Sequence, residues 1–162
     1  MDTDTPQSRM PIEDVGELPE SFRAVHPQIS RLELVAVGAG GAVGALGRVG
    51  LEQAWLTAPG SWPWATFAVN ILGAFLLGSL TTGLRHGPVS IPTYRLLGTG
   101  FCGALTTFST MQLELLQMLD RARYDLAIGY VSASVVVGYA VVSLAARLTA
   151  RATIGAPVEA ET

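Results

Sequence analysis

The sequence predicts an all-α membrane protein with four transmembrane helices, the third of them broken at mid-membrane. Only 14% of its 162 residues are charged and 49% are hydrophobic, whereas soluble domains carry about 25% charged residues. Four stretches contain no Asp, Glu, Lys or Arg, namely 34–47, 53–84, 96–113 and 126–146. Because roughly 20 apolar residues span a bilayer, the last three stretches meet or approach the required length directly.

The first helix is expected over 31–51 and is rich in glycine. Its charge-free stretch reaches membrane-spanning length only if the helix starts near Arg31 or continues past Arg48. Small residues at every third or fourth position allow a second helix to approach closely. The glycines of this stretch are Gly38, Gly40, Gly41, Gly44 and Gly47.

The other three helices are expected over 64–84, 93–119 and 124–148. A loop that contains proline and glycine precedes the second helix. Trp62 and Trp64 lie beside this loop and indicate a membrane interface, because amphipathic rings favour the level of the lipid headgroups.

The two ends of the chain, 1–30 and 150–162, are expected to be disordered tails around a membrane domain over 31–149. With four spans, both ends lie on one side of the membrane. Six arginines flank the spans on that side and three on the other, which slightly favours a cytoplasmic position for the ends. So small a bias also permits insertion both ways, and two opposite copies could then form an antiparallel pair.

The sequence contains no pattern typical of an enzyme. It has no zinc-ligand spacing, no phosphate-binding glycine loop and no Ser-His-Asp arrangement. The single cysteine, Cys102, excludes an internal disulfide and a cysteine-rich metal site, and packing is its expected role. We therefore expect no enzymatic activity, and we expect no nucleic-acid partner.

The stretch 98–111 has the wrong composition for a plain membrane helix. It combines three glycines with the hydroxyl residues Thr106, Thr107, Ser109 and Thr110, and it carries no charge. We expect it to leave regular helix, which is tolerated at membrane depth only where protein buries the backbone or where it lines a cavity. The hydroxyls either bond to carbonyls and bend the helix, or support an unwound turn that presents carbonyls to a cation.

Four more residues are candidates for the functional site. Three of them are polar, and polar groups inside membrane spans are functional or interface residues by default. Asn70 either forms an interhelical hydrogen bond or donates its amide to a permeating anion. Arg48 either extends to the interface or lines a positive vestibule. Glu114 is expected to pair with an arginine such as Arg48 rather than to couple protons. Phe108 either fills the core or turns its electropositive ring edge toward an anion.

Three ordered blocks with matching spacing stand out in the helices: GGAVGALGR at 40–48, TFAVNILGAFLLG at 66–78 and GFCGALTTFST at 100–110. With these blocks the chain resembles the CrcB/Fluc family of small bacterial fluoride channels, over about residues 32–148. The resemblance implies a passive channel of the cell membrane that exports fluoride and reduces its toxicity. It implies an antiparallel, dual-topology dimer with two pores, whose partners are membrane lipid and a second copy or a homologous subunit.

The resemblance also implies roles for particular residues. It implies a structural Na⁺ at the dimer centre, held by the backbone carbonyls of Gly103 and Thr106. Arg48 corresponds to the vestibule arginine, and Glu114 to the acidic position after the break. The implied pore or anion-binding positions are those of Asn70, Phe108, Ser109, Thr110, Met111, Tyr130 and Ser134.

Met111 departs from the family pattern, which commonly has a second phenylalanine three residues after the first. Phe108 and Met111 share a helix face at this spacing. A thioether lacks the electropositive edge of an aromatic ring, so the paired-ring anion site is altered.

Two alternative interpretations remain open. One is a small four-helix, proton-coupled exporter of cationic compounds, which needs a carboxylate inside the membrane, and Glu114 is the sole candidate. The other is a non-conducting partner subunit of a heterodimeric fluoride channel. Flux through the purified chain alone would separate these interpretations from the leading one.

Overall fold

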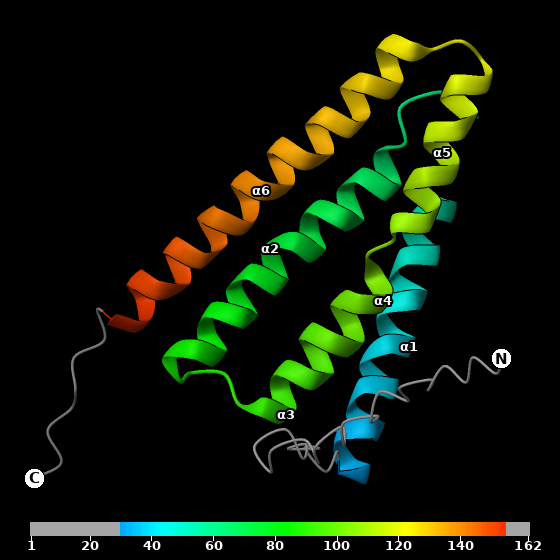
Figure 1. Cartoon of the computed structure of the whole chain (residues 1–162). Helices are drawn as coiled ribbons and strands as arrows, with labels where there is room; N and C mark the ends of the chain where they lie inside the picture. The colour runs from blue at the N-terminus through cyan, green and yellow to red at the C-terminus, as the bar shows by residue number, and fades with distance from the viewer. Residues whose placement is uncertain (1–29, 155–162) are drawn as a thin grey trace, which may run out of the picture.

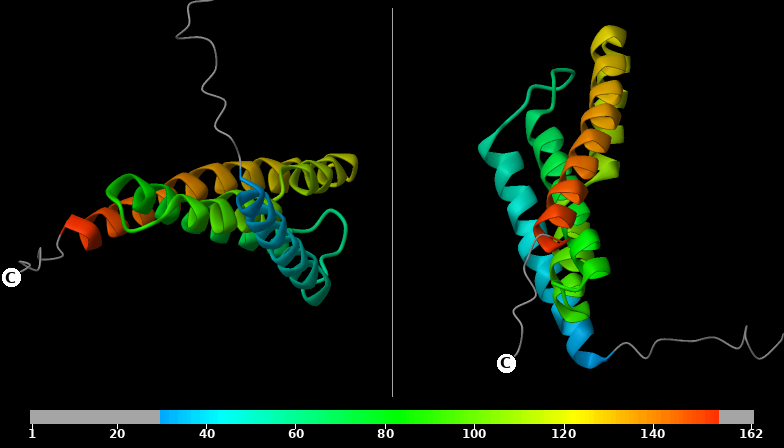
Figure 2. Two further views of the ribbon diagram at one scale, coloured as in Figure 1. Left: turned by 90° about the horizontal axis from the view of Figure 1, so that it is seen from below. Right: turned by 90° about the vertical axis from the view of Figure 1, so that its left-hand side faces the viewer.

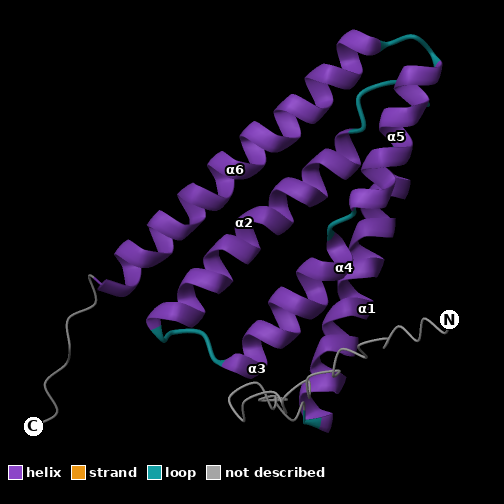
Figure 3. Ribbon diagram, in the orientation of Figure 1, coloured by secondary structure: helices purple, strands orange, loops and turns teal. Residues whose placement is uncertain are grey.

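The computed structural model describes residues 30–154, and this part of the chain is helical with short connections and no strand (Figure 3). The elements in chain order are α1 (Arg31–Ala54), α2 (Trp64–His86), α3 (Ile91–Tyr94), the π-helical η2 (Arg95–Cys102), α4 (Gly103–Leu105), α5 (Phe108–Asp120) and α6 (Tyr124–Ile154). Elements α3 to α5 follow one another as a single bent helix, so the predicted fold of four helices with a broken third is confirmed.

Three of these helices, α1, α2 and α6, are long and apolar enough to cross a membrane. The observed bounds differ from the predicted ones mainly at the carboxyl end of the chain. Helix α6 continues to Ile154, past the predicted domain boundary at 149, so residues 150–154 are helical rather than part of a tail. Apart from Ser30 and these residues, the two predicted tails lie outside the described residues.

The helices lie side by side in the order α6, α2, the bent third helix and α1 (Figure 1). Helix α2 packs along α6, and α1 packs against η2 and α4. Figure 2 shows α1 and α6 at opposite sides of the molecule with the third helix between them. The amino ends of α1 and α3 and the carboxyl ends of α2 and α6 lie together, at what we call the terminal end of the molecule.

Side-chain caps fix where the helices at the terminal end begin. Ser30 and Glu33 form a reciprocal capping box at the start of α1. The Glu33 carboxylate also pairs with Arg95 Nε at 3.2 Å, which ties α1 to the start of η2. Gly87 ends α2 with a φ of 96°, a left-handed conformation that favours glycine, and the Ser90 side chain caps α3.

Two glycines of α1 allow the backbones of α1 and η2 to touch. Gly40 and Gly44 are buried, and a Cβ on either would collide with a backbone carbonyl oxygen, that of Leu96 or of Phe101. Backbone atoms cannot move aside as the end of a side chain can. The close approach expected from the glycine repeat is therefore confirmed, and it holds the third helix against α1.

We expect Gly44→Ala to destabilise the protein and Gly38→Ala to leave it nearly unchanged. The first substitution overpacks the α1–η2 contact at a cost of about 1–3 kcal/mol. The second is on the same helix, where a Cβ would meet no atom within 4 Å. Thermal unfolding of the two purified variants in detergent measures the difference. Equal melting temperatures would contradict the backbone contact.

Candidate functional site

The third helix is interrupted at two consecutive residues, Thr106 and Thr107. Both have extended backbone, with φ and ψ of −79° and 151° at Thr106 and of −145° and 120° at Thr107. The break lies inside the stretch 98–111, so the expected departure from regular helix is confirmed. The π-helical turns of η2, which precede the break and are separated from it by α4, were not predicted. Such turns widen the backbone ring and often occur at functional sites.

The side chain of Asn70 on α2 binds the backbone of the break through both of its polar atoms. Its Nδ2 donates to the Thr107 carbonyl at 3.1 Å, and its Oδ1 accepts from the Thr107 amide at 2.8 Å. The structure thus contains the interhelical hydrogen bond that was one of two alternatives for Asn70. An amide nitrogen carries two hydrogens, so one donor of Nδ2 is left for another acceptor.

The break releases backbone carbonyls that would be hydrogen-bonded in a continuous helix. The Thr107 amide would pair with the Gly103 carbonyl, but it donates to Asn70 instead. The Thr110 amide would pair with the Thr106 carbonyl, but it donates to Thr107 Oγ1 at 3.1 Å, as in a helix N-cap. The carbonyls of Gly103 and Thr106 therefore lose their helical partners, and these are the two carbonyls for which the family resemblance implies a bound cation.

Arg48 on α1 bonds to a third carbonyl of the break. Its Nε donates to the Ala104 oxygen at 3.2 Å, and its Nη1 forms an ion pair with Glu52 at 3.3 Å. The guanidinium thus donates to the Ala104 carbonyl in place of the backbone N–H that would do so in a continuous helix.

Glu114 on α5 accepts two hydrogen bonds from hydroxyl groups. Thr66 Oγ1 on α2 donates to Oε1 at 2.5 Å, and the Tyr130 hydroxyl on α6 donates to Oε2 at 3.1 Å. The expected pairing of Glu114 with Arg48 is therefore wrong. Thr66 was not among the predicted residues, although it is one helical turn before Asn70 and so lies on the same face of α2.

Tyr130 is held in place by an aromatic group at the amino end of α2. It is fully buried, and its ring centroid lies 5.5 Å from that of Trp62, in an edge-to-face arrangement. Phe67 lies 5.7 Å from Trp62 in the same kind of arrangement. Trp62, expected as an interface residue, therefore packs against the small core of Met118, Ala127 and Tyr130.

The other predicted residues occupy two different environments. Phe108 is the first residue of α5 and 70% exposed, and Ser109 is exposed beside it. Met111, one turn later, is half-buried and packs against the core that contains Tyr130. Ser134 is half-buried on α6, one turn after Tyr130. Phe108 and Met111 thus differ in environment despite their spacing.

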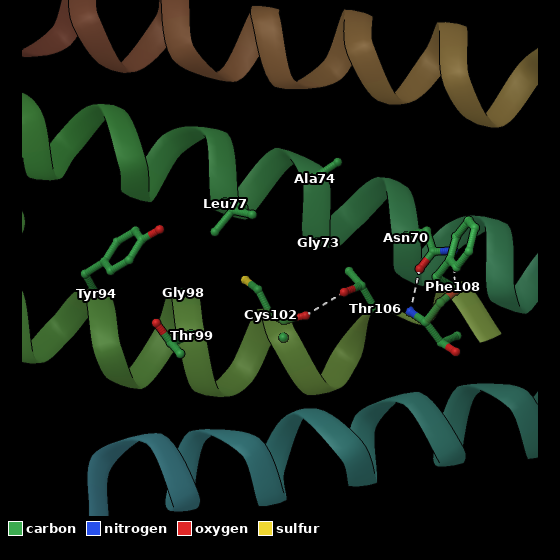
Figure 4. Close-up of a pocket in the computed structure, with 12 residues that line it drawn as sticks. Asn70, Gly73, Ala74, Leu77, Tyr94, Gly98, Thr99, Cys102, Thr106 and Phe108 are labelled. Atoms are coloured by element: carbon green, nitrogen blue, oxygen red, sulfur yellow. Dashed lines mark hydrogen bonds between the residues drawn. The ribbon is translucent and has the colours of Figure 1, made fainter. Parts of the chain in front are cut away.

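Hollows lie on both sides of the break. The first, which we call hollow 1, has a volume of about 490 Å³ and lies between α2 and the third helix (Figure 4). Asn70, Thr106 and Phe108 line it at the break, and Tyr94 lines it near the terminal end. Another hollow of about 280 Å³ lies under the α1–α2 loop, where Thr110 and Glu114 line it.

The described residues form four helices, and the third is discontinuous. Side chains of α1 and α2 bond to the backbone of the break. This arrangement defines a multi-pass membrane protein with a broken helix. Residues 35–146 match the family model described as "CrcB-like protein, Camphor Resistance (CrcB)". The chain belongs to this family.

Curated relatives share 39–52% of the aligned residues. The chain is 52% identical over 120 residues to "Fluoride-specific ion channel FluC 1" of Mycolicibacterium paratuberculosis, covering 74% of this chain and 91% of that protein. It is 48% identical over 123 residues to the protein of the same name from Mycobacterium bovis, covering 75% and 93%. It is 39% identical over 124 residues to "Fluoride-specific ion channel FluC" of Saccharophagus degradans, covering 76% and 93%.

We expect Tyr130→Phe to lower the free energy of unfolding by about 1–3 kcal/mol, because it leaves Glu114 without one of its two donors. Tyr139→Phe on the same helix is the matched control, since Tyr139 is 77% exposed. Chemical or thermal unfolding in detergent measures both. The assigned hydrogen bond is contradicted if the two variants lose equal stability.

Proposed function

We propose that the chain is a fluoride-selective channel that exports cytoplasmic fluoride passively. The observation that carries the proposal is the break at Thr106 and Thr107, where Asn70 keeps one free N–H beside hollow 1. The relatives named as fluoride-specific channels align with most of this chain and support the same function. Fluoride that has entered a cell as neutral HF ionises at cytoplasmic pH, and a channel lets the anion leave down its electrochemical gradient.

The proposed path gives fluoride donors in place of its hydration shell. The free Nδ2–H of Asn70 is one donor, and the Thr110 hydroxyl, which accepts from Thr107 Oγ1 and keeps its own hydrogen, is another. The Ser109 hydroxyl bonds to Thr107 Oγ1 and supports this group from beside the path. Phe108 lines the same hollow as Asn70 and offers an electropositive ring edge. Tyr130 and Ser134 continue the path along α6, while Met111 supports it from the core side. Arg48 holds the break from α1.

The working unit in this proposal is an antiparallel dimer of two copies. Phe108 is 70% exposed, so one copy alone does not enclose the path. A further hollow, of about 400 Å³, lies between α1 and the third helix. Tyr94 and Thr99 line both this hollow and hollow 1, so the third helix forms a ridge between two grooves. A ridge between grooves suits packing against the same surface of a second copy.

A structural Na⁺ at the dimer centre fits the donors that the break leaves free. The carbonyls of Gly103 and Thr106 have lost their helical partners to other bonds. Gly103 is exposed, and a Cβ on it would meet no atom within 4 Å, so its backbone is open to a partner. Backbone carbonyls of discontinuous helices commonly coordinate Na⁺. In the proposed dimer, Gly103 and Thr106 of both copies would hold the ion.

We expect liposomes that contain the purified chain to release fluoride but not chloride, and Asn70→Asp to abolish the release. The carboxylate loses both amide donors and adds a negative charge on the anion path. A fluoride electrode measures the efflux, and size-exclusion chromatography checks that dimers remain.

Gln53→Glu makes the same amide-to-carboxylate change at an exposed position near the end of α1 and should conduct normally. Unchanged efflux through Asn70→Asp would remove Asn70 from the path. If the chain alone carries no fluoride but does so with a homologous subunit, it is a partner subunit. A proton-driven cation flux that Glu114→Gln abolishes would instead identify an exporter.

A further inference from the structure

Arg48 reaches the break because glycine brings α1 against the third helix. Gly44 precedes it by one turn, and a Cβ there would collide with the Phe101 carbonyl. The Arg48 side chain is half-buried beside α4, with 27% of its surface exposed. From this position its Nε donates to the Ala104 carbonyl at 3.2 Å.

The bonded carbonyls of this segment lie on both sides of an open one. The Cys102 carbonyl accepts from the Thr106 amide at 3.0 Å and from Thr106 Oγ1 at 2.9 Å (Figure 4). The Ala104 carbonyl accepts from Arg48. Between them is the carbonyl of Gly103, which has lost its helical partner and is one of the two proposed to hold Na⁺. Arg48 therefore binds the residue next to the proposed cation ligand.

This segment needs bonds from outside to hold its orientation. Element α4 has three residues and ends in extended backbone at Thr106, so no continuing helix fixes its last turn. Gly103, its first residue, is exposed, and a Cβ on it would meet no atom within 4 Å. Glycine changes φ and ψ more freely than other residues. Packing therefore does not fix the direction of the Gly103 carbonyl, and a hydrogen bond to the next residue does.

Glu52 makes this bond compatible with a second cation nearby. The carboxyl end of a helix has partial negative charge and attracts cations. The Arg48 guanidinium is one cation at this end, and a Na⁺ would be another. The Glu52 carboxylate pairs with Arg48 Nη1 at 3.3 Å and offsets its charge. The pair thus supplies a hydrogen-bond donor with little net charge to repel an ion.

We propose that Arg48 is a positioning residue of the cation site. By holding the Ala104 carbonyl it orients the neighbouring Gly103 carbonyl, and with it the turn that ends at Thr106, for Na⁺. This inference rests on the Na⁺ site of the proposed channel dimer, and it adds the side chain on which the affinity for the ion depends. The role requires the N–H donor of Arg48, whereas a vestibule role requires its charge.

The first test measures how Na⁺ stabilises the purified protein in detergent. A ligand that binds the folded state raises Tm as its concentration increases. Na⁺ replaces N-methylglucamine at constant ionic strength, and the midpoint of the rise in Tm gives the apparent affinity. Groups that orient metal ligands typically contribute about 10- to 100-fold to affinity. We expect the midpoint to increase at least about 10-fold in Arg48→Met, which has no donor. Arg48→Lys keeps a donor and should stay within about 3-fold of wild type.

The matched control is Arg121→Met. Arg121 also donates to a backbone carbonyl, that of Gln117 at 3.2 Å, but on its own helix and away from the break. We expect this variant to keep the wild-type midpoint. The midpoint is read on the curve of each variant, so a general loss of stability does not move it.

Three results would overturn the proposal: equal midpoints in Arg48→Met and wild type, an equal increase in Arg121→Met, or an increase in Arg48→Lys as large as in Arg48→Met. Should Arg48→Met not fold, Glu52→Gln is the milder variant, because it removes the carboxylate that holds the guanidinium and offsets its charge. We expect about a 3-fold higher midpoint there, and an unchanged one would overturn the proposal.

The second test observes a carbonyl of the site directly. Two consecutive threonines occur twice in the sequence, at 81–82 and at 106–107. Threonine labelled with ¹³C at the carbonyl and with ¹⁵N therefore gives two carbonyl–nitrogen correlations in solid-state NMR, one from within α2 and one from the break. We expect Na⁺ to shift the signal of the break and to leave the α2 signal in place. In Arg48→Met the shift should need at least about 10-fold more Na⁺.

The outcomes separate this inference from the proposed function. A signal of the break that responds to the same Na⁺ concentrations in wild type and in Arg48→Met would overturn the role of Arg48 and leave the cation site. A wild type whose Tm and carbonyl signal both ignore Na⁺ would overturn the cation site and the inference with it. Fluoride efflux from liposomes of the same preparation tests the channel separately.

Discussion

The two hydrogen bonds between Asn70 and Thr107 are the interaction on which the rest of the site depends. An unpaired backbone group in the bilayer core costs several kcal/mol, so a helix cannot open at that depth unless another group replaces the lost bonds. Asn70 replaces the lost bond of the Thr107 amide and gives the Thr107 carbonyl, which accepts the first bond of α5, a second donor. This fixes the position of α5 relative to α2 and frees the Gly103 carbonyl, while the Thr107 side chain caps α5, whose first residue is Phe108, beside hollow 1.

Helix α1 holds the same break from the opposite side by a different means. Gly40, Gly44, Arg48 and Glu52 follow at four-residue steps and form one stripe of α1. The two glycines bring the backbones of α1 and η2 into contact, and at the next turn Arg48 reaches the Ala104 carbonyl. Close packing thus sets the distance at which a single side chain can complete the hydrogen bonding of the break.

Local sequence predicted the helices and the break because both depend on composition. Charge-free stretches mark the spans, and the cluster of glycine and hydroxyl residues marks the point where regular helix ends. The partners of individual side chains depend on packing between distant segments. Charge alone suggested that Glu114 pairs with Arg48, but α2 and α6 place two hydroxyls against Glu114. The π-helical turns of η2 likewise lie where the backbone of α1 touches the third helix, and the sequence of 95–102 does not by itself indicate them.

The discontinuous third helix also has a consequence for how the protein is made. Helices α1, α2 and α6 are apolar enough to enter a bilayer on their own, whereas neither part of the third helix qualifies as a span by itself. Insertion machinery releases segments into lipid according to their hydrophobicity. The third segment therefore enters the membrane most favourably once α2 is in place to accept its open backbone. The order of synthesis provides this, because the ribosome completes α2 before the segment that needs it.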